Sequence, residues 1–188
     1  MLGARLVRED ARGRRAGRIV EVEAYIGRDD RASHARFGPT ERNRVMFGWP
    51  GTAYVYLVYG MYHCLNVVTE PEGRAAAVLI RAVEPIEGAD AMQAARRASR
   101  GGHQARDVPA ARLASGPGLV GVAFDITRAD NLADLCDPAS PLRLEAGETP
   151  GAVATTPRIG IGYAPEPWLS HPWRFIVPGS PSLSRARP

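Results

Sequence analysis

The residue best placed for acid–base chemistry is Glu23, in the segment GRIVEVEAYI at residues 17–26. Tyr25 follows on the same side of a predicted strand, His34 follows in a short loop, and Tyr56 lies farther along the chain. A carboxylate between aromatic rings is partly desolvated, which favours a general base. The same rings could hold a flat ligand by stacking, since every nucleobase offers a π-face. The ordinary alternatives are a solvated glutamate on a strand and a histidine that makes only structural hydrogen bonds.

Tyrosines are concentrated in one segment, TAYVYLVYGMYHCLNVV at residues 52–68, which carries four of the six in the chain. Tyr54 and Tyr62 lie in the arms of a predicted hairpin, where tyrosine is a common strand residue and packing explains it equally well. Tyr59 lies at the bend, beside Gly60 and Met61, where exposure is expected. An exposed ring at a hairpin tip is suited to entering a base stack, as minor-groove wedges do.

Several classes of site are excluded by what the sequence lacks. The two cysteines, Cys64 and Cys136, make neither a zinc spacing nor a redox pair, and no second histidine lies near His34. We find no phosphate-binding loop and no nucleophile elbow. We therefore expect no metal and no cofactor.

The chain is basic, with a formal net charge of +4, and all 24 of its basic side chains are arginines. Arginine binds phosphates with two parallel hydrogen bonds, although codon usage explains most of this bias. The charge fits a polyanionic partner without demanding one. The first residues lack a long apolar run, so we expect neither a signal peptide nor a membrane span. We therefore expect a cytoplasmic protein.

The elements that must position these residues can be placed from periodicity. Alternation over residues 17–26 puts Ile19, Glu21, Glu23 and Tyr25 on one face. The other face is apolar and should meet the core: Val20, Val22, Ala24 and Ile26. The following loop should contain a short helical turn capped by Asp29 or Asp30.

Later elements follow from similar signals. Residues 53–68 predict two strands joined at Tyr59 and Gly60, with glycine supplying the positive φ of a tight turn. A buried strand at 75–83 is interrupted by Arg81. The remaining predictions are a helix at 87–100, a second helix capped by Ser115, and short strands in RIGIG (158–162) and WRFIVPG (173–179).

This order lacks the regular alternation of strand and helix of a doubly wound fold. We predict one compact α+β domain over residues 1–188, built on a curved, mostly antiparallel sheet with flanking helices and a protruding hairpin. Residues 1–16 and 180–188 should be loosely held.

The chain resembles a known family along nearly its whole length. RIVEVEAY, HARFGPTERNRVMF, PGTAYVYLVYGMYHCLNVV, VLIRAVEP, SGPG, RIGIG and WRFIVPGSP occur in the same order as in the alkyladenine (3-methyladenine) DNA glycosylases. The resemblance implies a monofunctional base excision repair enzyme without metal or lysine nucleophile. Such enzymes bend double-stranded DNA, insert a hairpin tyrosine, flip a damaged purine into a pocket and hydrolyse its N-glycosidic bond with an activated water.

The resemblance also implies roles for single residues. It places the general base on Glu23, and an arginine near the catalytic water on Arg81. It places a guanine-excluding amide on Asn66, and the intercalating ring on Tyr59, with Met61 beside it. The residues that stack on the base are Tyr25, His34 and Tyr56.

The implied partner is duplex DNA carrying 3-methyladenine, 7-methylguanine, ethenoadenine or hypoxanthine. The implied setting is the nucleoid of a bacterial cytoplasm, with the protein a monomer. The chain departs from the family in REDARGRR near the N-terminus and in SLSRARP at the C-terminus.

Two rival functions remain at this stage. One is a DNA-shape binder without catalysis, against which the intact Glu23 and its stacking residues argue. The other is an enzyme acting on free nucleosides, for which an exposed Tyr59 would serve no purpose.

Overall fold

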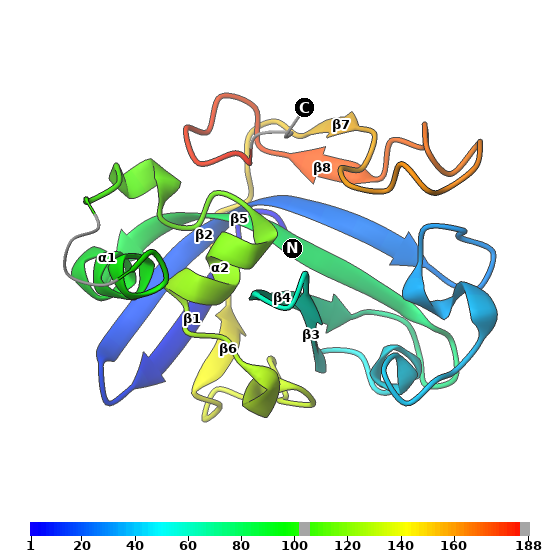
Figure 1. The fold of residues 1–188 in the computed structure, drawn as a ribbon, viewed down its shortest axis with the longest axis horizontal. Helices are drawn as coiled ribbons and strands as arrows, with labels where there is room; N and C mark the ends of the chain where they lie inside the picture. The colour runs from blue at the N-terminus through cyan, green and yellow to red at the C-terminus, as the bar shows by residue number, and fades with distance from the viewer. Residues whose placement is uncertain (102–105, 185–188) are drawn as a thin grey trace.

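A single antiparallel sheet forms most of the fold. The computed structural model describes residues 1–101 and 106–184, and in that part of the chain the strand order is β3-β4-β5-β2-β1-β6, with β8 pairing both β2 and β7. The strands are β1 (Arg5–Asp10), β2 (Gly13–Ile26), β3 (Ala53–Val58), β4 (Tyr62–Val68), β5 (Ala76–Glu87), β6 (Leu142–Glu145), β7 (Ala154–Thr156) and β8 (Arg174–Ile176). The sheet curls into a half-barrel, with α-helices beside it (Figure 1). The predicted α+β domain with a curved antiparallel sheet is confirmed.

The helical segments are short. They are α1 (Ala89–Ala98), α2 (Pro117–Ala123) and single 3₁₀ turns at η1 (His34–Phe37), η2 (Arg44–Phe47), η4 (Ala110–Arg112) and η5 (Arg128–Asp130). Helix α2 packs closely on β4, because Gly118 and Gly121 leave no space for a side chain: an added Cβ would lie 2.8 Å from the Tyr62 ring and 2.1 Å from the His63 carbonyl oxygen. Throughout the described ranges, we find no helix with the length and apolar character needed to cross a membrane.

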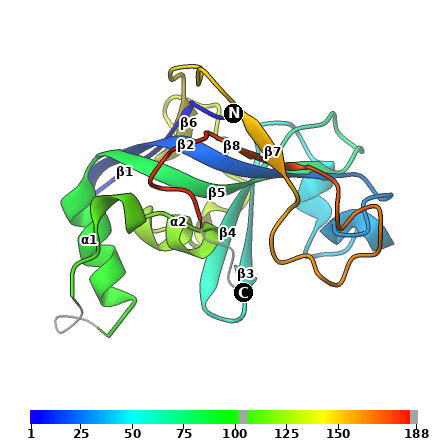
Figure 2. The same cartoon turned by 90° about the horizontal axis from the view of Figure 1, so that it is seen from above.

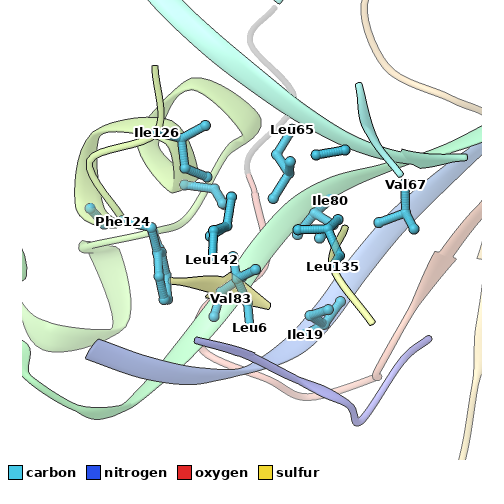
Figure 3. Packing of buried hydrophobic residues seen from close by; sticks show 14 of the residues in the cluster. Leu6, Ile19, Leu65, Val67, Ile80, Val83, Phe124, Ile126, Leu135 and Leu142 are labelled. Carbon is cyan, nitrogen blue, oxygen red and sulfur yellow. The ribbon is translucent and has the colours of Figure 1, made fainter. Parts of the chain in front are cut away.

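The core lies between α2 and the concave side of the sheet (Figure 3). Its buried side chains come from segments that are far apart in the chain, and they include Leu6, Ile19, Leu65, Ile80, Val83, Phe124, Ile126, Leu135 and Leu142. Each such side chain contributes about 1.5–3 kcal/mol when fully buried. This core packs against the long β2–β5 pair, which carries the candidate catalytic residues.

The β2–β5 ladder is irregular at one point. Ile19 pairs with Val83, Glu21 with Ala82, and Val22 with Ile80. Val20 on β2 and Arg81 on β5 therefore have no partner in the β2–β5 register. The irregularity breaks the strict alternation expected for residues 17–26, since Ile19 and Val22 both join the core. Bulges of this kind re-aim side chains next to functional sites.

The N-terminal segment is part of the sheet, which corrects the expectation that residues 1–16 are loosely held. Strand β1 pairs with β2 on one side and with β6 on the other, and Leu6 and Val7 are fully buried. Strand β2 begins at Gly13 rather than at residue 17. The arginine-rich stretch concealed these strands because its charged side chains form ion pairs across the sheet, such as Arg14 with Glu145.

Other local predictions also need correction. The turn η1 is capped by Ser33, whose Oγ accepts a hydrogen bond from the Ala35 N–H, and not by Asp29 or Asp30. Helix α2 has Gly116 at its N-cap, one residue after Ser115.

Three further expectations differ from the structure. Ile26 is about half exposed, because it lies at the open end of β2 beyond the core. Residues 158–162 form bends and turns, not a strand. In the C-terminal segment Ser182 and Ser184 are buried, whereas residues 185–188 lie outside the described part of the chain.

The predicted hairpin is confirmed, and it projects from the rest of the sheet (Figure 2). At its tip the Met61 N–H donates to the Val58 carbonyl at 3.1 Å. Both central residues have positive φ, 50° at Tyr59 and 67° at Gly60. Two positive φ values are characteristic of a type I′ turn, which normally carries asparagine or glycine at the first position. Tyr59 is therefore in a backbone conformation that is unfavourable for its type.

Candidate active site

One cavity of about 520 Å³ opens beside the hairpin. This volume is typical of small-molecule sites and can accommodate a purine. Its walls come from β2, β3, β4, β5, the start of α2 and the loop after β7. Seven of the side chains predicted from the sequence line it: Tyr25, His34, Tyr56, Tyr59, Met61, Asn66 and Arg81.

The carboxylate of Glu23 lies directly behind this lining and is fully buried. Its Oε2 accepts hydrogen bonds from the Tyr25 hydroxyl at 2.9 Å and from Arg81 Nη1 at 3.2 Å. Its Oε1 accepts from the Ile159 N–H at 2.7 Å. All three donors belong to residues that line the cavity, so the carboxylate is oriented from three sides. An ionised carboxylate offers about four acceptor positions, which leaves room for one further donor.

Arg81 joins Glu23 to a second buried carboxylate, Glu21. Its Nε donates to Glu21 Oε1 at 2.9 Å, and its Nη1 to Glu23. Burial opposes ionisation of Glu21, yet its pKa is lowered because Arg174, Ser184 and Arg81 donate to or attract the carboxylate. Burial likewise disfavours the Arg81 cation, but Glu23 and Glu21 together raise its pKa. The site thus contains a fixed array of buried charges.

His34 and two tyrosines form the aromatic wall. The His34 ring meets the Tyr56 ring edge to face at 4.7 Å between centroids, and His34 Nδ1 lies 2.9 Å from the Tyr54 hydroxyl. Burial, reinforced by the charges of Arg42 and Arg36, lowers the pKa of His34 to about 4. The imidazole is therefore neutral at neutral pH and does not repel a cationic ligand. Tyr54 is almost fully buried, as the packing alternative predicts, and it also orients His34.

Tyr25 is held from behind by Arg158. The Arg158 guanidinium lies 4.7 Å from the centre of the Tyr25 ring, and it makes two hydrogen bonds to Asp30, at 2.6 and 2.9 Å. Burial, followed by the Glu23 charge, raises the pKa of Tyr25 well above its usual value, so its hydroxyl remains a donor. Sequence reasoning missed Arg158 and Asp30, whose pairing joins segments far apart in the chain.

Asn66 lies deep in the cavity wall and is buried. It pairs with Tyr54 on β3 and with Leu79 on β5. Its Nδ2 donates to the Tyr54 carbonyl at 3.0 Å, which fixes the orientation of the amide. At the other end of the cavity, Tyr59 and Met61 form an exposed rim, with 84% and 68% of their surface accessible.

Further lining residues were not predicted as site residues. They come from the start of α2, from the loop after β7 and from the C-terminal segment: Ser115, Gly116, Pro117, Gly118, Ile159, Gly160, Ile161, Tyr163 and Ser184. The glycine-containing stretches SGPG and RIGIG were visible signals, because close approach to a ligand favours glycine. Ser184 carried no comparable signal.

The donor set does not suggest a metal site. Within residues 1–101 and 106–184, no group of three or more histidine, cysteine, aspartate or glutamate side chains is arranged to hold an ion. Cys64 is buried against Tyr56, and burial raises the pKa of its thiol to about 11. Cys64 therefore behaves as a small packing residue.

Comparisons with known proteins gave matches along nearly the whole chain. The family described as Methylpurine-DNA glycosylase (MPG) matches residues 1–181. A protein of Methanocella arvoryzae named "Putative 3-methyladenine DNA glycosylase" is 52% identical over all of this chain and 89% of its own length. Proteins of the same name from Anaeromyxobacter dehalogenans and Myxococcus xanthus are 50% and 45% identical, again over the whole chain and over 80% and 87% of their own lengths.

Proposed function

The chain belongs to the methylpurine-DNA glycosylase family and is thereby a DNA-3-methyladenine glycosylase. We propose that it flips alkylated or deaminated purines out of duplex DNA. We propose further that it hydrolyses their N-glycosidic bonds with a water activated by Glu23. The substrates proposed are 3-methyladenine, 7-methylguanine, ethenoadenine and hypoxanthine. The observation that carries the proposal is the buried Glu23 carboxylate, held by three donors directly behind a purine-sized aromatic cavity.

The chemistry follows from these contacts. A water that donates to the remaining acceptor position of Glu23 becomes a better nucleophile as the carboxylate takes its proton. Breaking a purine glycosidic bond develops positive charge on the sugar, and a buried carboxylate stabilises that charge strongly. The chain contains no lysine to form a Schiff base, since all 24 basic side chains are arginines. The product is an abasic site.

The remaining residues would select and hold the flipped base. Tyr25, His34 and Tyr56 offer aromatic surfaces on which a purine can stack, and the neutral His34 accepts cationic alkylated bases. Asn66 is buried in the cavity wall, and its amide would exclude guanine by a clash with the exocyclic amino group of that base. The exposed Tyr59 ring, with Met61 beside it, would fill the space left in the duplex. That the enzyme is a monomer and that it acts on the nucleoid of a bacterial cytoplasm both stay predictions.

The test uses a duplex oligonucleotide with one hypoxanthine or ethenoadenine, treated with alkali after incubation so that abasic sites become breaks. Wild type should produce breaks at the lesion. Glu23→Gln keeps the side-chain shape but cannot take a proton, so excision should fall by roughly 10²–10⁴-fold while binding of lesion DNA persists.

Each rival function predicts a different result. Lesion binding by wild type without any breaks would support a non-catalytic DNA-shape binder. Cleavage of free nucleosides alone would support a nucleoside hydrolase. Near-normal excision by Glu23→Gln would remove the assignment of the general base, even if the protein is a glycosylase.

A further inference from the structure

Glu21 is a buried charge that the proposed reaction does not use directly. No part of its side chain is accessible, and it accepts four hydrogen bonds. Arg81 Nε, Arg174 Nε and Ser184 Oγ donate to Oε1 at 2.9, 2.7 and 2.6 Å, and the Ser184 N–H donates to Oε2 at 2.6 Å. A carboxylate with this many donors is held in place and is a poor base.

Burying such a group is unfavourable in itself. Desolvation of an ion costs several kcal/mol, and well-packed apolar residues often stabilise a core equally well. The core next to Glu21 is apolar on the same strand, at Ile19 and Val22. A role in stability alone therefore accounts poorly for a glutamate here.

The contact with Arg81 indicates what Glu21 does. Arg81 is the residue that the β5 register skips, so its guanidinium turns toward β2 between two carboxylates. Guanidinium groups favour two parallel hydrogen bonds with a carboxylate. Because Glu21 holds Nε, only Nη1 of Arg81 reaches Glu23, at 3.2 Å. Glu21 thereby prevents Arg81 from covering both oxygens of Glu23.

The C-terminal segment holds Glu21 in turn. In Figure 2 this segment runs from β8 across β5 toward α2. The Leu183 carbonyl accepts hydrogen bonds from Ser115 Oγ at 2.8 Å and from Arg112 Nη1 at 3.0 Å, which fixes the segment beside α2. The next residue, Ser184, donates both its N–H and its hydroxyl to Glu21, and its Oγ accepts from Arg81 Nη2 at 3.4 Å. Ser184 also lines the cavity.

We propose that Glu21 is a positioning residue for the glycosylase reaction: it keeps Arg81 in a single contact with Glu23, and Ser184 of the C-terminal segment holds Glu21 in place. The inference rests on the proposed function. It makes the end of the chain a working part of the site, although the sequence indicated only a loosely held tail.

The first experiment compares two buried serines of the same segment. Ser184→Ala removes the hydroxyl that donates to Glu21 and accepts from Arg81. Ser182→Ala removes a hydroxyl that is also buried but finds no hydrogen-bond partner among the described residues. Single-turnover excision of hypoxanthine should slow by about three- to tenfold in Ser184→Ala. The rate for Ser182→Ala should stay within about twofold of wild type, and affinity for lesion DNA should be unchanged in both. Equal rates in the two variants would overturn the proposal.

The second experiment asks whether Glu21 acts through Arg81. Glu21→Gln should slow excision by about 10- to 100-fold in the wild-type background, because the catalytic geometry loosens. In an Arg81→Met background the same change should alter the rate by no more than about twofold, since coupled residues are not additive. An equal loss in both backgrounds would show a merely structural role and overturn the proposal.

A control and a fallback complete the design. Asp130→Asn removes a carboxylate that pairs with Arg8 at 2.7 Å and does not line the cavity, so it should lower the melting temperature without changing the rate. If Glu21→Gln or Arg81→Met does not fold, the serine pair still decides. If the wild-type protein releases no base, the proposed function itself is refuted. If the wild type and the variants are all active at the same rate, only the positioning role of Glu21 is refuted.

Discussion

Replacing Tyr59 by asparagine should make the protein more stable and at the same time a weaker binder of lesion DNA. Tyr59 occupies the first central position of the hairpin turn with φ of 50°. Its ring is 84% exposed, so it contributes little burial to the fold. Asparagine tolerates positive φ, and an asparagine–glycine pair is the preferred sequence of a type I′ turn.

The expected magnitude follows from the backbone. A left-handed conformation costs an ordinary L-residue about 1–2 kcal/mol, and asparagine removes part of that cost, so unfolding should require roughly 0.5–1 kcal/mol more. For a chain of this size the melting temperature should rise by about 1–4 °C. Stacking of a ring on a base contributes about 1–3 kcal/mol, so affinity for lesion DNA should fall by roughly five- to 150-fold.

The assay pairs a thermal melt with titration of a fluorescent duplex that contains one hypoxanthine. Leu132 is the matched control, because it also has positive φ, 76°, and is 62% exposed, but it does not line the cavity. Leu132→Asn should raise the melting temperature similarly and leave DNA affinity unchanged.

Two results would refute this reasoning. A lower melting temperature for Tyr59→Asn would mean that the ring stabilises the fold. Unchanged affinity for lesion DNA would mean that the ring does not enter the duplex, and the backbone strain at the turn would have no functional explanation.

Two further predictions concern the cavity wall. Asn66→Ser should enlarge the corner that excludes guanine, so release of normal guanine from duplex DNA should rise above the wild-type level while hypoxanthine excision persists; if guanine release does not rise in the active variant, Asn66 is not the gate. The pKa of His34 is lowered from 6.5 to about 4, so the unfolded chain binds more protons within that window, and stability should decrease as pH falls from about 6.5 to about 4. Melts at several pH values should show a smaller decrease in His34→Gln, and identical profiles would contradict the burial of a neutral imidazole.

The sequence by itself determined the local elements whose signals are short-range. Alternating apolar residues and the glycine at the bend predicted the hairpin at 53–68 and its turn at Tyr59 and Gly60, because strand period and turn chemistry act between near neighbours. The spacing of Glu23 and Tyr25 likewise placed a carboxylate and a hydroxyl on one side of β2, and they are in contact. The quoted motifs were specific enough to indicate the family, to which the chain belongs.

Only the tertiary structure decided which distant charges meet. Glu21 is bound by Arg174 and Ser184, more than 150 residues later in the chain, and Asp30 is bound by Arg158, which is 128 residues later. No periodicity encodes such pairs, because they depend on how the ends of β2 and β8 and the C-terminal segment pack together. The irregular register at Val20 and Arg81 depends on both strands at once. The arginine-rich N-terminal stretch forms strand β1 and the start of β2 for the same reason. Its charges are neutralised by partners on other strands, such as Glu145 for Arg14, which a single segment cannot reveal.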